Sequence, residues 1–266
     1  MDKRISLKFV LWSCFFSAIP WGILLALNLD STGWCLPLML LGCLGPAAAS
    51  FLVTKKHGIV TGFSHWLATG LNPKLPLLSW LLPLGLFAVF AVTLLCFGIF
   101  PGKNWPLSLI LAFAVFGPGE LGWRHVLQPL TSLRLSFFLS VCTTACAWML
   151  WSLPMAFMEK SWLFSASIVM FAVLYIGLSF VLGSIRRITR ATLPCALCAS
   201  LTGSWIISGA PKMAAPGDKT LIAFSAAVFL AAAAGFILVL IDKKRPFLPP
   251  NPVPRESRAK PRKKSK

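Results

Sequence analysis

The chain has 266 residues, of which 57% are hydrophobic and only 12% are charged, and its formal net charge is +18. Soluble domains carry about 25% charged residues, so this composition excludes a soluble globular domain. The mean hydropathy is +0.80, and apolar runs near the roughly 20 residues that cross a bilayer as a helix recur along the chain. The sequence therefore predicts an all-α, multi-pass integral membrane protein.

Apolar runs predict a bundle of about eight transmembrane helices within residues 1–242. The expected spans are 9–28, 33–54, 77–100, 105–118, 135–157, 162–184, 192–210 and 220–241. The fourth and seventh runs are short and cross a bilayer only with their flanking turns. Pro118 is expected to mark a helix start at the end of the fourth run. No small-residue cleavage site follows the basic N-terminal segment, so the first run is expected to be a span rather than a signal peptide.

Basic residues concentrate in one set of alternating loops. On that side the sequence places Lys3, Arg4, Lys8, Lys55, Lys56, Lys74, Arg134, Arg186, Arg187, Arg190 and the C-terminal tail. The opposite loops hold Lys103, Lys160, Lys212 and Lys219, together with Asp30, Glu159 and Asp218. This asymmetry predicts cytoplasmic N- and C-termini. It also explains the high net charge without a nucleic-acid partner, and none is expected.

Residues 243–266 form a separate region, KKRPFLPPNPVPRESRAKPRKKSK, that is rich in proline and basic residues. It has almost nothing to bury, so a disordered polybasic cytoplasmic tail is expected. Basic residues near an anionic leaflet each contribute about 1 kcal/mol of attraction. We therefore expect a topology signal and a loose contact with membrane lipids, with a specific partner of the tail as the alternative.

Cysteine and histidine usage narrows the chemistry. The eight cysteines lie within or at the ends of apolar runs and are expected to be buried free thiols. Cys195 and Cys198 have zinc-like spacing, but a structural zinc site needs four ligands, so no metal or cofactor is expected. Neither HExxH nor GxSxG occurs among the residues, which argues against a zincin or a serine hydrolase. His57 and His65 are interpreted as ordinary interfacial residues.

The stretch GPGELGWRHVLQPL places Glu120 and Arg124 four positions apart, on one face of a helix. A charged side chain at mid-bilayer costs roughly 2.5–3.5 kcal/mol on insertion scales, so such residues are usually paired and often functional. The two residues are therefore either part of a catalytic centre or a local ion pair.

The segment ELGWR at 120–124, with LQPL at 127–130, resembles the first motif of the CPBP family, EELGWRGYLLPRL. These are the CAAX-protease and bacteriocin-processing intramembrane endopeptidases. Other segments follow in the family's order. The first is the proline-containing stretch 45–54. The second is AWMLWSLP at 147–154, which is similar to the family's WALWHLP. The third is TRATLPCALCAS at 189–200, which is similar to RTGGSLLPAILLHA. The resemblance covers roughly residues 35–240 and implies a CPBP-like core.

Several positions depart from what the resemblance implies. The motif's first glutamate, the general base that activates water, falls at Gly119, while Glu120 and Arg124 match its second glutamate and its arginine. A histidine of the second motif falls at Ser152. The histidine and asparagine of the third motif fall, depending on register, at Cys198, Ala199 or Ser200 and at Thr202, Gly203 or Ser204. No register recovers either residue.

Loss of a general base alone removes a factor of about 10²–10⁴ in rate. We therefore expect a pseudoprotease of the bacterial cytoplasmic membrane that binds a peptide or a membrane-protein partner, in immunity, export or regulation. The alternative is an active endopeptidase with an atypical site that uses Glu120, including Ser152 as a nucleophile with Glu120 as its base. A third interpretation, a transporter or lipid-handling protein, lacks support, since no second intramembrane charge is visible to couple to a substrate.

Overall fold

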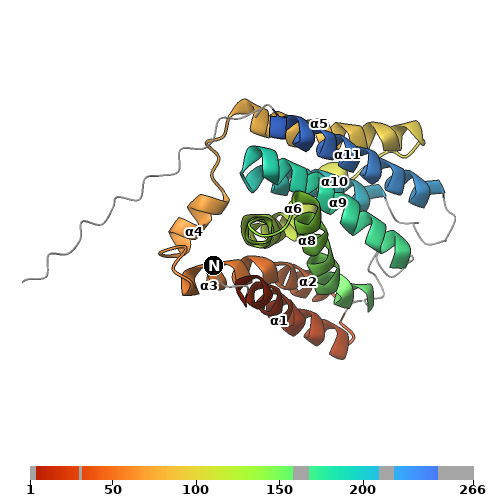
Figure 1. Ribbon diagram of the computed structural model, residues 1–266. Helices are drawn as coiled ribbons and strands as arrows, with labels where there is room; N and C mark the ends of the chain where they lie inside the picture. Colours follow the sequence, from red (N-terminus) through yellow and green to blue (C-terminus); the bar gives the residue numbers. More distant parts are fainter. Residues whose placement is uncertain (1–3, 30–31, 158–167, 210–218, 245–266) are drawn as a thin grey trace, which may run out of the picture.

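The computed structural model describes residues 4–29, 32–157, 168–209 and 219–244, and every regular element in those ranges is a helix (Figure 1). The N-terminal elements are α1 (Arg4–Ala26), α2 (Cys35–Cys43), α3 (Gly45–Lys56) and the short α4 (Phe63–Gly70). They are followed by α5 (Leu77–Cys96), α6 (Trp105–Gly122), the π-helical turn η1 (Trp123–Leu127), α7 (Gln128–Ser132) and α8 (Phe137–Ser152). The last elements are the 3₁₀ turn η2 (Leu153–Phe157), α9 (Ile168–Thr189), α10 (Leu193–Gly209) and α11 (Lys219–Lys244).

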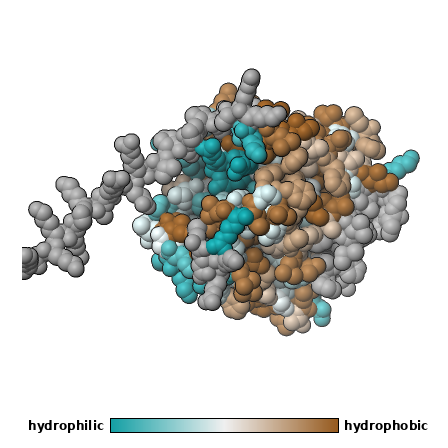
Figure 2. All heavy atoms as spheres, in the orientation of Figure 1, coloured by the Kyte–Doolittle hydropathy of each residue, from teal (hydrophilic) through white to brown (hydrophobic). Residues whose placement is uncertain are grey.

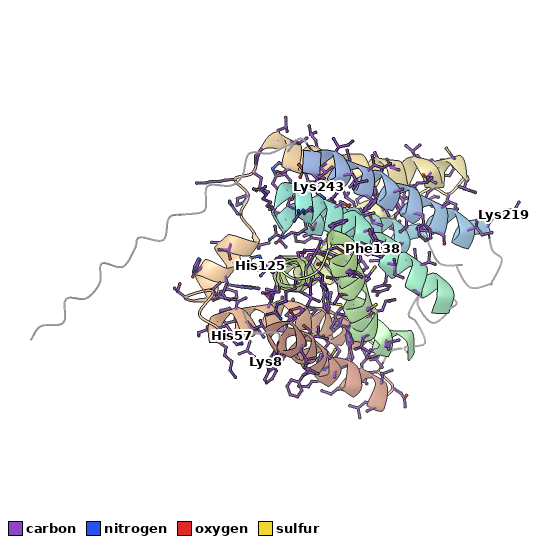
Figure 3. All side chains as sticks on the ribbon, viewed as in Figure 1. Lys8, His57, His125, Phe138, Lys219 and Lys243 are labelled. Atoms are coloured by element: carbon purple, nitrogen blue, oxygen red, sulfur yellow. The ribbon has the colours of Figure 1, made fainter. Side chains whose placement is uncertain are left out.

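Seven helical runs of the described chain are long and apolar enough to cross a membrane, and α10 is a shorter apolar helix. Figure 3 places Lys8 of α1 and Lys243 of α11 at one end of the bundle, and Lys219 at the opposite end. α10 occupies the position of the seventh predicted span, 192–210. The predicted all-α membrane bundle is confirmed, with seven candidate spans and this shorter apolar helix among the described residues.

The fourth span differs from its prediction. Pro118 was expected to mark a helix start after a span of 105–118, but it lies inside α6, and the helical run continues through η1 and α7 to Ser132. In lipid, a broken helix would leave backbone N–H and C=O groups without water to bind. Continuing the helix with one missing N–H costs less than ending it there, so the proline is accommodated within a 28-residue run.

The long helical run of α6, η1 and α7 lies at the centre of the molecule. Figure 1 shows α1, α2 and α3 on one side of it and α5 with α11 on the other, with α8, α9 and α10 between these groups. α10 packs closely against α6, and α1 packs against α3. Tryptophans fill much of the core: Trp21, Trp123, Trp148, Trp151 and Trp205 all belong to one buried cluster. The two charged residues of the central helix are thereby enclosed by protein.

The outer surface of the bundle is apolar. Large side chains such as Leu77 and Ile110 are about 70% exposed, and Figure 2 shows hydrophobic residues over most of the visible body. Exposed apolar surface on this scale requires a lipid environment. The chain is thus an integral membrane protein whose helices contact lipid. Of the predicted tail, only Lys243 and Lys244 are described, as the end of α11, and the remainder lies outside the described residues.

Candidate functional site

Glu120 and Arg124 form a buried salt bridge on the central helix. The Arg124 Nε atom donates to Glu120 Oε2 at 3.1 Å, and the Arg124 and Glu120 side chains are 0% and 1% exposed, respectively. Arg124 also donates from Nη1 to Gln128 Oε1 and from Nη2 to Ser179 Oγ, each at 3.0 Å. Gln128 in turn donates to the Gly183 carbonyl at 3.3 Å. The arginine therefore joins the central helix to α9 through a chain of charge-assisted hydrogen bonds.

The π-helical turn at η1 explains how a second arginine joins this network. The Gln128 N–H donates to the carbonyl of Trp123, five residues earlier, instead of to that of Arg124. The next residue, Pro129, has no N–H to give. The Arg124 carbonyl is left for another donor, and Arg186 Nε of α9 binds it at 2.7 Å. Turns of π-helix are frequent at functional sites.

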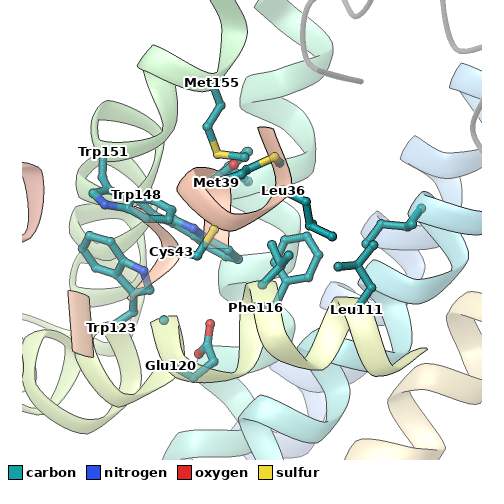
Figure 4. A pocket seen from close by; sticks show the side chains of 14 residues that line it. Leu36, Met39, Cys43, Leu111, Phe116, Glu120, Trp123, Trp148, Trp151 and Met155 are labelled. Carbon is teal, nitrogen blue, oxygen red and sulfur yellow. The ribbon is translucent and has the colours of Figure 1, made fainter. Parts of the chain in front are cut away.

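Glu120 also faces a cavity of about 180 Å³ (Figure 4). The lining residues are Leu36, Met39, Cys43, Leu111, Val115, Phe116, Gly119, Glu120, Trp123, Trp148, Trp151, Met155, Tyr175 and Ile207. Nearly all of them are apolar or aromatic. Two polar atoms at this wall have no hydrogen-bond partner among the described residues: Glu120 Oε1 and Trp123 Nε1. An acceptor and a donor are thus buried together beside an apolar space.

Gly119 lines the same cavity, and its position could hold a side chain. A Cβ atom built on Gly119 would lie 3.5 Å from Trp123 Nε1, which is an ordinary van der Waals distance. The unpartnered indole N–H therefore lies beside the place where the resemblance implies a glutamate. A carboxylate at this position would have both room and a nearby donor.

Ser152 is fully buried at the end of α8, beside the cavity rather than in its lining. Its hydroxyl donates to the Trp148 carbonyl at 2.9 Å and is also hydrogen-bonded to Tyr175. Glu120 is not among its hydrogen-bond partners, so the geometry does not provide the base that a Ser152 nucleophile would need.

The third candidate segment lies on α10 and lines a smaller, adjoining cavity. Ala199 and Gly203 face this space of about 20 Å³, which shares Phe116, Trp148 and Tyr175 with the first cavity. A Cβ atom at Gly203 would clash with the Phe116 ring, so a larger residue there would displace Phe116. The other candidate positions of this segment, Cys198, Ser200, Thr202 and Ser204, are buried but are not among the lining residues. The three candidate segments thus meet at two neighbouring cavities.

None of the three histidines, all of which are described, lines either cavity. His125 lies between Thr69 and Thr192, 3.4 Å from the hydroxyl of each. His65 contacts Thr61, in the α3–α4 connection. Within the described ranges, no three His, Cys, Asp or Glu residues are grouped as metal ligands. The eight cysteines are free thiols, but the prediction that all are buried is wrong, because Cys96 and Cys146 are exposed on the outer surface of the bundle.

Sequence reasoning missed three members of this site. Gln128 extends the four-residue spacing of Glu120 and Arg124, so helical periodicity could have identified it. Ser179 and Arg186 approach from α9, 55 and 62 residues away from Arg124 in the chain. No local pattern points to them.

No protein-family model matches the sequence, and no curated protein matches it. The likeness to CPBP endopeptidases therefore rests on the motif segments themselves.

Proposed function

We propose that this protein is a non-proteolytic relative of the CPBP intramembrane endopeptidases that binds a hydrophobic peptide segment in the Glu120 cavity. The observation that carries the proposal is the pair of unpartnered polar atoms, Glu120 Oε1 and Trp123 Nε1, at the wall of an otherwise apolar space. Each buried, unsatisfied group costs about 1–3 kcal/mol. A ligand that supplies both partners recovers that free energy on binding.

An extended peptide segment matches this pair, because the N–H and C=O of one residue in a strand point to the same side. The N–H can donate to Glu120 Oε1, and the C=O can accept from Trp123 Nε1. The cavity, at about 180 Å³, is smaller than the roughly 300–1,000 Å³ of sites for drug-sized ligands and cofactors. It suits one apolar side chain and its adjacent backbone. The ligand class is therefore a membrane-embedded peptide or an unwound segment of another membrane protein, in immunity, export or regulation.

Hydrolysis is the competing function, and the chemistry at the wall weighs against it. Peptide hydrolysis requires a base for the attacking water and donors for the oxyanion. Glu120 is bound to Arg124 through one oxygen, Gly119 has no side chain, and the histidines lie elsewhere. An endopeptidase with an atypical site would have to obtain all proton transfers from Glu120 alone.

The proposal includes an orientation in the bacterial cytoplasmic membrane. Lys55 and Lys56 end α3, and Arg186 and Arg187 lie in the last turn of α9. With the positive-inside asymmetry, this supports a cytoplasmic location for that end of the bundle and for both termini.

Site-specific photo-crosslinking in membranes tests the binding function. A photo-reactive residue at Met155, on the cavity wall, is expected to form peptide-containing adducts. The same residue at Leu150, which is 57% exposed on α8, should yield lipid adducts only. The variants Trp123→Phe and Glu120→Gln each alter one polar partner and should reduce the Met155 adducts about tenfold, as expected for a hydrogen bond worth about 1–1.5 kcal/mol. The proposal would be overturned if Met155 formed adducts with lipid only, or if neither variant changed the yield of peptide-containing adducts.

A further inference from the structure

We propose that the protein binds the phosphate group of an anionic phospholipid in a second, basic cavity, which lies at the ends of α7, α9 and α11. This cavity has a volume of about 430 Å³. Its polar wall consists of Gln128, Ser132, Arg186, Arg187, Arg190 and Asp242. It is separate from the Glu120 cavity, and neither proposal depends on the other.

Charge points to the kind of ligand. Three arginines face one aspartate across the cavity, which leaves an excess of two positive charges on the wall. Guanidinium groups present several N–H donors in one plane, a geometry that matches phosphate oxygens bidentately. Basic pockets between transmembrane helices are known to take lipid head groups of this class.

Arg186 is held in place before any ligand binds, whereas Arg187 and Arg190 are exposed. Arg186 is fixed by its Nε bond to the Arg124 carbonyl, the group that η1 and Pro129 leave without a backbone donor. Arg190 has φ of +56°, a left-handed conformation that residues with a Cβ adopt rarely and at some cost. Its N–H caps the end of α9 by donating to the Arg186 carbonyl at 3.0 Å. The fixed position of the Arg186 side chain reduces the entropy that it loses on binding.

The depth of the cavity distinguishes a lipid from a soluble anion. The two neighbouring candidate spans end at Thr189 and Lys243, so the cavity lies at head-group level. About 10 Å farther into the membrane, at 1.5 Å per residue, the rings of Phe137, Phe180 and Phe236 pack together.

Beside this aromatic cluster, an apolar surface is available for acyl chains. Phe138 is 55% exposed, and Ile237 and Ile241 on α11 are also exposed large hydrophobic side chains. A ligand with one phosphate and apolar chains matches both parts of this surface.

Lipid titration of the purified full-length chain, in uncharged detergent, tests the inference by native mass spectrometry. The probes are dioleoyl phosphatidylglycerol and, as the uncharged comparison, dioleoyl phosphatidylcholine. The double variant Arg187→Gln, Arg190→Gln removes two exposed cavity charges. Its matched control is Lys55→Gln, Lys56→Gln, which removes two exposed charges at the end of α3, outside the cavity. Melting curves are recorded for both variants, and binding is compared between folded proteins.

The wild type is expected to retain phosphatidylglycerol at least about tenfold better than phosphatidylcholine. The arginine variant should weaken that binding about 30-fold, and the lysine control less than about threefold. Equal losses in both variants would overturn the inference, because they would indicate general attraction to a basic surface. Equal retention of the two lipids would also overturn it, as would displacement of phosphatidylglycerol by millimolar inorganic phosphate, which would indicate a soluble anion.

Discussion

Replacement of Arg124 by leucine is expected to lower the free energy of unfolding by about 3–5 kcal/mol. The arginine is fully buried and holds three side-chain partners: Glu120, Gln128 and Ser179. Removing it leaves the Glu120 carboxylate inside the protein without its counter-charge, and it frees the polar groups of the other two. Thermal or denaturant unfolding of the purified protein in detergent measures the loss.

The matched control replaces both members of the salt bridge, as Glu120→Leu with Arg124→Leu. Buried ion pairs replaced by apolar residues of similar volume are often neutral in stability. The double variant should therefore regain much of the free energy of unfolding that the single variant loses. The part that comes from the hydrogen bonds to Gln128 and Ser179 stays lost. A double variant as unstable as the single one would show that the unpaired carboxylate is not the cause.

Restoring the family's groups at two positions is expected to create hydrolysis. The variant Gly119→Glu, Ser152→His should cleave peptides about 10² times faster than the wild type, the lower end of the range for a positioned base. Gly119 has room for a side chain beside Trp123 Nε1, and Ser152 adjoins Trp148 and Tyr175 of the same cavity wall. The lower end applies because the histidine and asparagine of the third motif are still missing.

The control is the variant Gly119→Gln, Ser152→His, whose glutamine has the size of glutamate without the carboxylate. Its rate of peptide cleavage should stay at background. Both variants are compared only where their melting temperatures show a folded protein. If the restored variant is folded and shows no more turnover than its glutamine control, then Gly119 and Ser152 do not occupy the catalytic positions that the resemblance implies.

The architecture could be predicted from sequence because lipid imposes one strong constraint. Apolar runs near 20 residues must be helices in a bilayer, and this was sufficient to predict about eight spans. The end of the fourth span was predicted wrongly, since a proline and two charges after Phe116 resemble a helix terminus. The run to Ser132 persists because its charges are satisfied by neighbouring helices rather than by water.

The site was predictable only where its residues share one helix. The spacing of Glu120 and Arg124 places them on the same face, and Gln128 continues that pattern. Ser179 and Arg186 join through the packing of α9 against η1, which depends on the π-helical turn and on Pro129. Neither the cavity nor its unpartnered indole N–H follows from local sequence, because side chains from α2, α6, α8 and α9 must meet to form that wall.

Arg186 connects the two proposed sites physically. Its guanidinium binds the Arg124 carbonyl and also faces the basic cavity. The network that holds Glu120 at the apolar cavity therefore continues, through one hydrogen bond, to the end of the bundle where lipid head groups lie.

Peptide cleavage by the purified protein tests the central claim most directly. The wild type and Glu120→Ala are incubated with a panel of hydrophobic peptides in detergent or nanodiscs, and products are quantified by mass spectrometry. A protein that binds without cleaving should give the same background with both forms. Turnover by the wild type that disappears in folded Glu120→Ala would contradict this account and identify an active endopeptidase.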